Sequence, residues 1–287
     1  MKFILAQPSI LRFQWELEVL LTNLKQFGEH EVTLLFSEHD FTVPTYLANK
    51  YGCGVFMYQD MREDKGYIPA IRPYLLWRHF SSHPELTQET YFYIDSDIIF
   101  REMVDFATLG GGPKVIVGSD CSSYINYDYL IKCRKGEEIV AKMAEICGIT
   151  VNQMKTAPGI GAQLLLTNPT AAFWERSYHD SNRIYNYLNG VDSNIQKWTA
   201  EMWAQLWGWV REGYELKMPK SMDFCRPTDD IAEWGKVSIM HNAGVTGSGE
   251  LFFKGAYDLT SPLGKDFSYV SKKKVSSKYV EALAKVL

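Results

Sequence analysis

The sequence predicts an α/β protein whose mainly parallel sheet is flanked by helices. The first observation is that short apolar runs of strand length alternate, over residues 1–120, with segments of helical periodicity. The second is the length of 287 residues, which fits one large α/β domain or two small ones. The third is an ordinary globular composition, 46% apolar and 22% charged, which supplies a packed core.

The first half reads as strands joined by helical crossings, the arrangement that produces parallel strands. One helix face is marked by Phe13, Leu17, Leu20, Leu21 and Leu24. In chain order we expect a strand over 2–6, this helix, a strand over 31–36, a helix over 42–50 with Thr42 as N-cap and Pro44 in its first turn, a strand over 54–58, a helix over 68–80, and strands over 90–94 and 114–118.

The second half is less regular and richer in helices. We expect a helix over 137–147, a glycine loop over 157–161, a strand over 163–167, helices over 171–188 and 199–210, and a strand over 237–241. No internal repeat, low-complexity tract or clear linker interrupts the chain. We therefore expect a single domain over 1–287, divided into halves at 1–120 and 121–287.

Two carboxylates, Asp95 and Asp97, follow the apolar strand Tyr-Phe-Tyr-Ile. In an extended segment they point the same way and Ser96 points opposite. Two hard oxygen donors on one side suit Mg²⁺ or Mn²⁺. An Asp-x-Asp triplet arises by chance roughly once in a chain of this length. The prediction of a metal site therefore depends on the apolar strand residues on both sides of the triplet. A strand-end turn with solvated aspartates is the alternative.

Three further residues are candidates for the same site. His241 ends a strand and is a reasonable third ligand for Mn²⁺, although a hydrogen-bonded histidine without a metal would look the same. Lys254 could reach a diphosphate as a point charge, and Arg72 could bind phosphate or sugar through its planar fork. Either could instead be an ordinary surface cation.

Other candidates lie at expected strand ends, in the glycine loop and on a helix. Gln7 and Asp60 lie where ligands collect in open α/β sheets, which makes them candidate nucleotide contacts. Gly161 would let the backbone approach a sugar, and Gln163 offers an amide for hydroxyls. Glu201 could accept a proton or bind an acceptor, or it could simply favour the start of its helix.

Composition narrows the classes of partner. A net charge of −4 argues against an extended nucleic-acid-coating surface but is compatible with a local basic groove. The short basic run at 272–274 is interpreted as solvated, with contact to a membrane or an acidic partner as the alternative. The 17 Tyr, 15 Phe and 8 Trp could stack on sugars or bases, although most are expected in the core. The odd cysteine set and the absence of a signal peptide or an apolar run of about 18 residues predict a cytoplasmic protein without a transmembrane segment. The cysteines are Cys53, Cys121, Cys133, Cys147 and Cys225.

Together these motifs resemble the GT-A glycosyltransferase superfamily. Its members share a Rossmann-like nucleotide-binding sheet, an Asp-x-Asp motif, a glycine loop, an acidic residue on a later helix and a C-terminal metal-binding histidine. Asp95 and Asp97 match the first motif, 159–163 the loop, Glu201 the acidic residue and His241 the histidine. The resemblance implies a nucleotide-sugar-binding half over 1–120, and over 121–287 a half with the acceptor side and a C-terminal metal and diphosphate segment.

Within the superfamily, two motifs are similar to the hydroxyproline arabinosyltransferase and peptidyl-serine galactosyltransferase group. These are Arg72-Pro73 ahead of a helix and Glu201-Met202-Trp203, and His241 adds to the likeness. The spacing of His241 and Gly244 also resembles glycogenin-type galactosyltransferases, although the lysine that those enzymes carry six residues after the histidine is Gly247 here. Lys254 is the candidate substitute. Both groups retain the anomeric configuration, which implies a front-face mechanism in which the diphosphate takes the acceptor proton.

The resemblance implies a metal-dependent glycosyltransferase that moves a sugar from a nucleoside diphosphate to an acceptor hydroxyl. We expect the nucleoside diphosphate to be UDP. Mn²⁺ or Mg²⁺ would be held by Asp95, Asp97 and His241, with Gln7, Asp60, Asp95, Gly161 and Lys254 around the donor and Glu201, Gln163 and Arg72 in catalysis. A sugar-nucleotide nucleotidyltransferase and a non-catalytic glycan-binding scaffold are the alternatives. The acceptor, whether a glycan, a protein or a modified nucleobase, stays open, as do the donor sugar, the stereochemistry of transfer, the choice between Mn²⁺ and Mg²⁺ and the oligomeric state.

Overall fold

The expected α/β class is confirmed. The computed structural model describes residues 1–244, 247 and 249–286. Its larger sheet has seven strands in the order β3-β2-β1-β4-β7-β6-β8, and a smaller sheet has the order β5-β10-β9. The larger sheet is mostly parallel, with β7 antiparallel to both of its neighbours. Contacts group the chain into two compact units, described here one at a time: unit 1 is Met1–Met57, Ile94–Thr108 and Lys220–Leu287, and unit 2 is Tyr58–Tyr93 and Leu109–Pro219.

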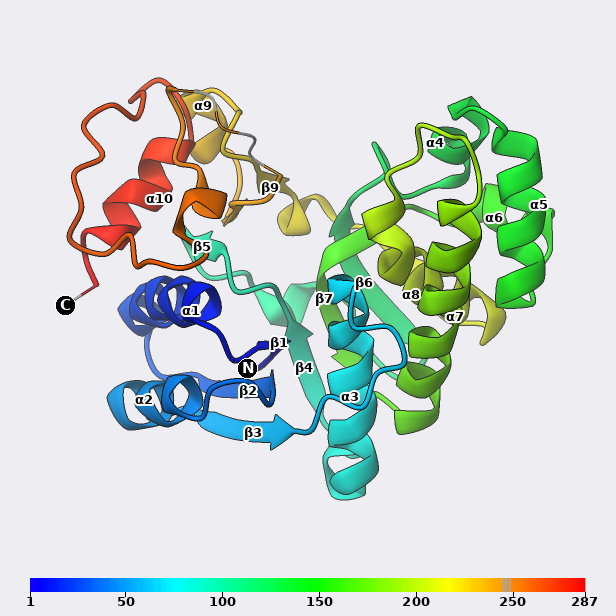
Figure 1. Cartoon of the computed structure of the whole chain (residues 1–287), viewed down its shortest axis with the longest axis horizontal. Coiled ribbons are helices and arrows are strands. Elements are labelled where there is room, and N and C mark those ends of the chain that lie inside the picture. The colour runs from blue at the N-terminus through cyan, green and yellow to red at the C-terminus, as the bar shows by residue number, and fades with distance from the viewer. Residues whose placement is uncertain (245–246, 248, 287) are drawn as a thin grey trace. The chain divides into compact units, whose positions relative to one another are not determined.

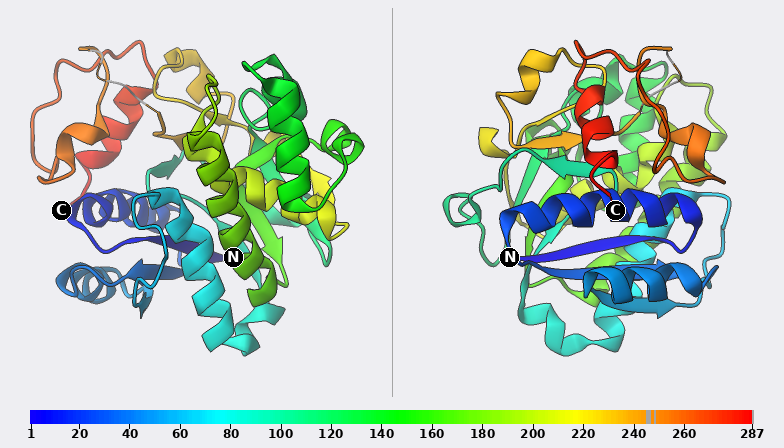
Figure 2. Two further views of the ribbon diagram at one scale, coloured as in Figure 1. Left: turned by 45° about the vertical axis from the view of Figure 1, so that its right-hand side comes forward. Right: turned by 90° about the vertical axis from the view of Figure 1, so that its left-hand side faces the viewer.

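Unit 1 begins with a strand, helix and strand that follow the expected pattern. β1 and β2 pair in parallel from Lys2 opposite Glu31 to Pro8 opposite Ser37. The helix α1 contacts both α2 and the C-terminal helix α10 (Figure 2). The elements are β1 (Lys2–Pro8), α1 (Leu11–Leu24), η1 (Lys25–Phe27), β2 (Glu31–Ser37), α2 (Thr42–Tyr51), β3 (Gly54–Tyr58), β5 (Ile98–Phe100), η4 (Phe106–Thr108), η6 (Lys220–Met222), β9 (Phe224–Cys225), α9 (Ile231–Trp234), β10 (Ile239–His241), η7 (Lys254–Tyr257) and α10 (Ser276–Leu283).

One apolar cluster of unit 1 joins segments that are far apart in the sequence. Trp15 of α1 and Tyr279 of α10 belong to it, together with Ile99 of β5 and Met240 of β10. All four side chains are almost fully buried. Because burial of apolar surface is the main stabilising contribution, this cluster fixes the β5-β10 pair, whose ends carry the candidate site.

Unit 2 is a sheet portion with helices that contact one another. α7 packs against both α3 and α8, and Figure 1 shows α7 running alongside them. The elements are η2 (Ile68–Ala70), α3 (Ile71–Ser82), η3 (Pro84–Gln88), β4 (Thr90–Tyr93), β6 (Val115–Asp120), α4 (Tyr127–Lys132), α5 (Gly136–Cys147), α6 (Val151–Thr156), β7 (Ile160–Thr167), α7 (Ala171–Asn189), η5 (Lys197–Thr199), α8 (Ala200–Arg211) and β8 (Glu215–Lys217).

Some local expectations are wrong. Thr42 is the first residue of α2 rather than its cap, because the preceding Asp40 accepts hydrogen bonds from the Thr42 backbone N–H at 2.8 Å and from its hydroxyl at 2.6 Å. The expected helix over 68–80 opens with a 3₁₀ turn, where Pro69 follows Ile68. Strand β7 begins at Ile160, inside the expected glycine loop. The expectation of a donor half and an acceptor half divided at residue 120 stays a prediction.

No helix within the described part of the chain combines the length and the apolar character needed to cross a bilayer. The five cysteines are all free thiols.

Unit 2 contains a histidine that should make stability depend on pH. His79 of α3 is buried, and its Nδ1 lies 2.9 Å from the Tyr58 hydroxyl. Burial, with a smaller contribution from His83, lowers the pKa of His79 to about 4, while Glu85 acts in the opposite direction. Below its usual pKa of about 6.5 the unfolded chain therefore binds a proton that the folded chain does not.

We expect this difference to lower the free energy of unfolding as pH falls from about 6.5 to about 4. Urea titrations at a series of pH values should give a shallower slope for His79→Gln, which keeps a polar partner for Tyr58 but does not titrate. Parallel pH profiles for the two proteins would contradict the assignment.

Candidate functional site

The Asp-Ser-Asp segment forms a turn between two buried strands. β4 ends at Tyr93 and β5 begins at Ile98, with Ser96 and Asp97 in the turn between them. The expected extended geometry is therefore wrong at this point, because the chain makes a turn at Ser96 and Asp97 before it enters β5, a strand of the smaller sheet. Asp97 is 3% exposed and Asp95 is partly exposed. A backbone hydrogen bond of 2.9 Å from Asn242 N–H to the Asp97 carbonyl anchors the turn.

Strand pairing brings His241 to this turn. β10 runs antiparallel to β5 with His241 opposite Ile98, the residue after Asp97. The His241 Nε2 atom lies 3.1 Å from Asp97 Oδ1 and 3.4 Å from Asp95 Oδ2. One ligand atom from each of the three residues lies within 4.8 Å of the others. The three predicted metal ligands therefore converge within unit 1.

The donor set fits a divalent cation. Two carboxylates supply hard oxygen atoms and the imidazole adds a nitrogen, a combination suited to Mn²⁺ and less so to Mg²⁺. Three protein ligands also leave coordination positions for water or phosphate oxygens. Asp95, Asp97 and His241 could thus hold a metal ion.

Lys254, the predicted diphosphate contact, lies beside the same carboxylate. Its ammonium forms an ion pair with Asp97 Oδ2, the oxygen that does not face His241. Burial would raise the pKa of Asp97, but the charges of Lys254 and His241 hold it well below its usual range. Burial would lower the pKa of Lys254, but Asp97 and Glu16 keep it raised. Asp97 is therefore a carboxylate and Lys254 an ammonium at neutral pH.

Sequence reasoning missed a buried carboxylate behind the turn, Glu16 of α1, and its partly exposed partner Arg12. Glu16 Oε2 accepts a hydrogen bond from the Ser96 hydroxyl at 2.5 Å, and Glu16 Oε1 accepts one from Arg12 Nε at 3.0 Å. Burial raises the pKa of Glu16 against the opposing charges of Lys254 and Arg12. The available signal was an oppositely charged pair four residues apart on a helix.

Gln7, the other candidate in unit 1, is buried at the end of β1. Its amide nitrogen donates to the Leu35 carbonyl of β2 at 3.1 Å. This bond uses part of its hydrogen-bonding capacity within the sheet. A nucleotide contact by Gln7 stays a prediction.

In unit 2, the structure pairs Arg72 of α3 with Glu201 of α8. The guanidinium contacts Glu201 Oε1, and Gln205, one turn further along α8, donates to Glu201 Oε2. Glu201 is 1% exposed, whereas the Arg72 side chain keeps 20% of its surface in solvent. Both carboxylate oxygens of Glu201 therefore accept hydrogen bonds from neighbouring side chains.

Asp60 is linked to this pair through a chain of contacts. Its carboxylate accepts hydrogen bonds from Arg62 Nε at 2.9 Å and from Arg62 Nη2 at 3.0 Å. Arg62 in turn donates to the Tyr67 carbonyl at 2.9 Å, and the Tyr67 hydroxyl accepts from the Glu201 backbone N–H at 2.9 Å. Asp60 thus organises a loop next to Glu201, and its role toward a nucleotide stays a prediction.

Gln163 and Gly161 lie at an irregular point of β7. The Gln163 amide oxygen accepts from the Ser119 hydroxyl at 2.6 Å. A register shift in β6 falls between Gly118 and Ser119, and Ala162 has a positive φ of 55°. A Cβ on Gly161 would lie 2.6 Å from the Met202 methyl group. The glycine therefore permits close packing of β7 against α8, the helix that carries Glu201.

Gly159, two residues earlier, is packed more tightly. A Cβ at this position would lie 2.0 Å from the Ile125 carbonyl oxygen, and a backbone atom cannot move aside as a flexible side chain can. We expect Gly159→Ala to lower the free energy of unfolding by about 1–3 kcal/mol through overpacking. In Gly112→Ala, the matched control, the new Cβ meets no atom within 4 Å. Equal urea midpoints for the two variants would contradict the expectation.

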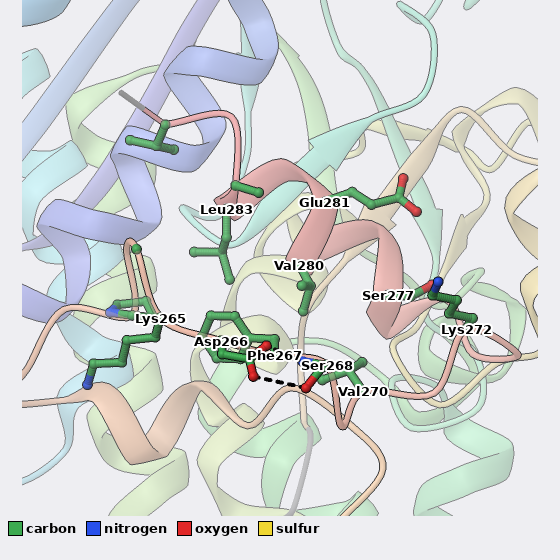
Figure 3. A pocket seen from close by; sticks show the side chains of 14 residues that line it. Lys265, Asp266, Phe267, Ser268, Val270, Lys272, Ser277, Val280, Glu281 and Leu283 are labelled. Atoms are coloured by element: carbon green, nitrogen blue, oxygen red, sulfur yellow. Dashed lines mark hydrogen bonds between the residues drawn. The ribbon is translucent and has the colours of Figure 1, made fainter.

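A separate groove of about 490 Å³ lies in unit 1 between α10 and the preceding loop (Figure 3). Apolar side chains such as Phe267, Val280 and Leu283 line it. The formal charges of the residues that line it sum to zero, because two lysines, Lys265 and Lys272, are matched by Asp266 and Glu281. None of the predicted site residues lines this groove.

Comparison with known proteins identifies the fold. No protein-family model matches the chain, and no curated protein matches it. Among solved structures the chain is similar to the apo structure of WbbM, a bifunctional glycosyltransferase, with a TM-score of 0.54 and 9% sequence identity. The likeness covers 99% of this chain and 49% of WbbM, so the chain spans about half the length of the protein that it matches. The chain therefore shares the fold of the matched part of WbbM, and it carries an Asp-Asp-His group in unit 1 that could hold a metal ion.

Proposed function

We propose that this chain is a metal-dependent glycosyltransferase that transfers a sugar from a UDP-linked donor to an acceptor hydroxyl. The observation that carries the proposal is the convergence of Asp95, Asp97 and His241 within 4.8 Å. The likeness in fold to a solved glycosyltransferase supports it. The closer resemblance to the hydroxyproline arabinosyltransferase and peptidyl-serine galactosyltransferase group is part of the proposal.

On the donor side, the residues of unit 1 have complementary tasks. Asp95, Asp97 and His241 would hold Mn²⁺ or Mg²⁺, which when bound stabilises the negative charge that builds on the departing diphosphate. Lys254 adds a positive charge beside the same carboxylate. Arg12 and Glu16 hold Ser96, and with it the turn that presents both aspartates.

On the acceptor side, Glu201 fits a positioning role better than a general base. Both of its oxygens accept hydrogen bonds, one from Arg72 and one from Gln205, and a carboxylate held in this way is a weak proton acceptor. This supports a retaining, front-face reaction in which the diphosphate oxygen takes the proton of the acceptor. Arg72, which keeps part of its side chain in solvent, would then bind a sugar hydroxyl, whereas Gln163, which is fully buried, would support the glycine segment from behind.

A panel of nucleotide-sugars tests the proposal directly. Each donor is incubated with the protein and Mn²⁺, Mg²⁺ or excess chelator, and the released products are separated by chromatography. The expected result is release of nucleoside diphosphate from a UDP-sugar that stops with chelator. Release of pyrophosphate would instead indicate a nucleotidyltransferase.

Isothermal titration calorimetry with UDP separates an enzyme from a glycan-binding scaffold. We expect UDP affinity to depend on Mn²⁺, because metal and diphosphate share coordination. The absence of measurable UDP binding, both with and without Mn²⁺, would contradict the proposal.

A further inference from the structure

Two aromatic side chains of unit 2 form an accessible surface next to Glu201. Trp198 of η5 is 50% exposed, and Tyr124 is partly exposed. The two ring centroids lie 6.3 Å apart and the ring planes differ by 29°. The rings are therefore neighbours at a shallow angle, and about half of the Trp198 surface is open to solvent.

Hydrogen bonds fix Trp198 relative to Glu201. The buried Tyr67 hydroxyl donates to the Trp198 carbonyl at 2.9 Å and accepts from the Glu201 backbone N–H at 2.9 Å. Tyr67 is itself held by stacking on Tyr185, with ring centroids 3.9 Å apart. The backbone that carries the indole is therefore fixed, which lowers the entropy that must be lost when a ligand binds.

Tyr124 is fixed against the glycine segment. Its hydroxyl donates to Cys121 Sγ at 3.2 Å, and the Cys121 backbone N–H donates to the Gly159 carbonyl at 2.8 Å. A Cβ on Gly161 would lie 3.2 Å from the same sulfur. The aromatic pair therefore borders both the glycine segment and the start of α8.

The polar groups around the pair favour a neutral sugar over a nucleic acid. The segments that carry the rings, 120–128 and 194–199, contain Asp120, Asp128 and one cation, Lys197. Two further cations contact them: Lys155 lies over the Tyr127 ring, and Arg134, which hydrogen-bonds Asn194, is itself paired with Asp192. Positive charge is therefore not in clear excess. A surface that binds a nucleic-acid strand needs several cations for the phosphates. The same segments offer hydroxyl, amide and carboxylate groups, which suit sugar hydroxyls, while the rings suit the C–H face of a pyranose.

We propose that Trp198 and Tyr124 form a stacking platform for a pyranose ring of a glycan, which serves as the acceptor. Binding of a pyranose at this pair does not depend on the proposed transferase activity. The assignment of that sugar as the acceptor does rest on the proposed function. The platform narrows the acceptor class from any hydroxyl to a saccharide, in place of the hydroxyproline or serine hydroxyl that the closer resemblance implies.

The indole N–H resonance of Trp198 provides a direct readout. It is identified in a ¹H–¹⁵N spectrum by its disappearance in Trp198→Phe. Methyl pyranosides of glucose, galactose, mannose and N-acetylglucosamine are then titrated at millimolar concentrations. We expect at least one of them to shift this resonance in a saturable way. The affinity of the variants for that glycoside is then measured by ligand-observed NMR. We expect Trp198→Ala to bind it about tenfold more weakly and Trp198→Tyr to bind it with near-native affinity.

Met61→Ala is the matched control, because Met61 is an exposed apolar residue of unit 2, 66% exposed, that lies outside the platform. The proposal is overturned if no pyranoside shifts the Trp198 resonance, or if Trp198→Ala binds the glycoside as the wild type does. A shift caused by single-stranded oligothymidylate but by no pyranoside would assign the platform to nucleic acid instead. Mn²⁺-linked UDP affinity, measured on the same wild-type sample, reports separately on the proposed transferase function.

Discussion

Replacing Asp97 with alanine is expected to abolish Mn²⁺-linked UDP binding and to lower sugar transfer by about 10²–10³-fold. Asp97 is the only residue that contacts both His241 and Lys254 among the described ion pairs. Its loss removes a metal ligand and also leaves the Lys254 ammonium without its nearest counter-charge. The effect should therefore exceed that of removing His241 alone.

Two measurements separate loss of the site from loss of the fold. Electron paramagnetic resonance of free Mn²⁺ gives metal affinity without nucleotide, and urea denaturation gives stability. His241→Ala should weaken Mn²⁺ binding at a smaller cost in stability, because it leaves no buried charge unpaired. Asp105→Ala removes an exposed carboxylate of the same unit and should bind metal normally. Wild-type turnover of the UDP-sugar by Asp97→Ala would place the metal centre elsewhere.

The second large effect is expected at Glu201, where alanine should lower the free energy of unfolding by about 3 kcal/mol. The substitution leaves Arg72 and Gln205 without the carboxylate that both contact. The loss lies at the lower end for a buried pair, because the Arg72 side chain is still 20% exposed. Urea denaturation monitored by circular dichroism measures it, with the exposed helical Glu175→Ala as a control within about 0.5 kcal/mol of wild type.

A double variant distinguishes structural from chemical use of this pair. Arg72→Met with Glu201→Met removes both charges and should recover much of the stability lost in Glu201→Ala, because apolar residues of similar volume often replace a buried pair without cost. Sugar transfer should stay low if the pair also binds the acceptor. Recovery of both stability and transfer in the double variant would reduce the pair to a structural element.

Much of the fold follows from local patterns. Strands β1 to β4 and helices α1, α5, α7 and α8 are each long or periodic enough for their hydrophobic pattern to place them within a few residues. The strands β5, β8 and β9 are two or three residues long, and so short a segment shows no periodicity. Their positions depend on pairing with distant segments.

The sequence by itself determined the fold class and the identity of the candidate metal ligands, because apolar periodicity and the chemistry of aspartate and histidine are local properties. Only the tertiary structure decided how these side chains are used. It replaced the expected extended strand by a turn at Asp97, and it set Lys254 and Glu16 beside it. It also engaged Glu201 with Arg72 and fixed Trp198 next to them. These contacts join residues far apart in the chain, where burial makes each charge depend on neighbours that no local pattern reveals.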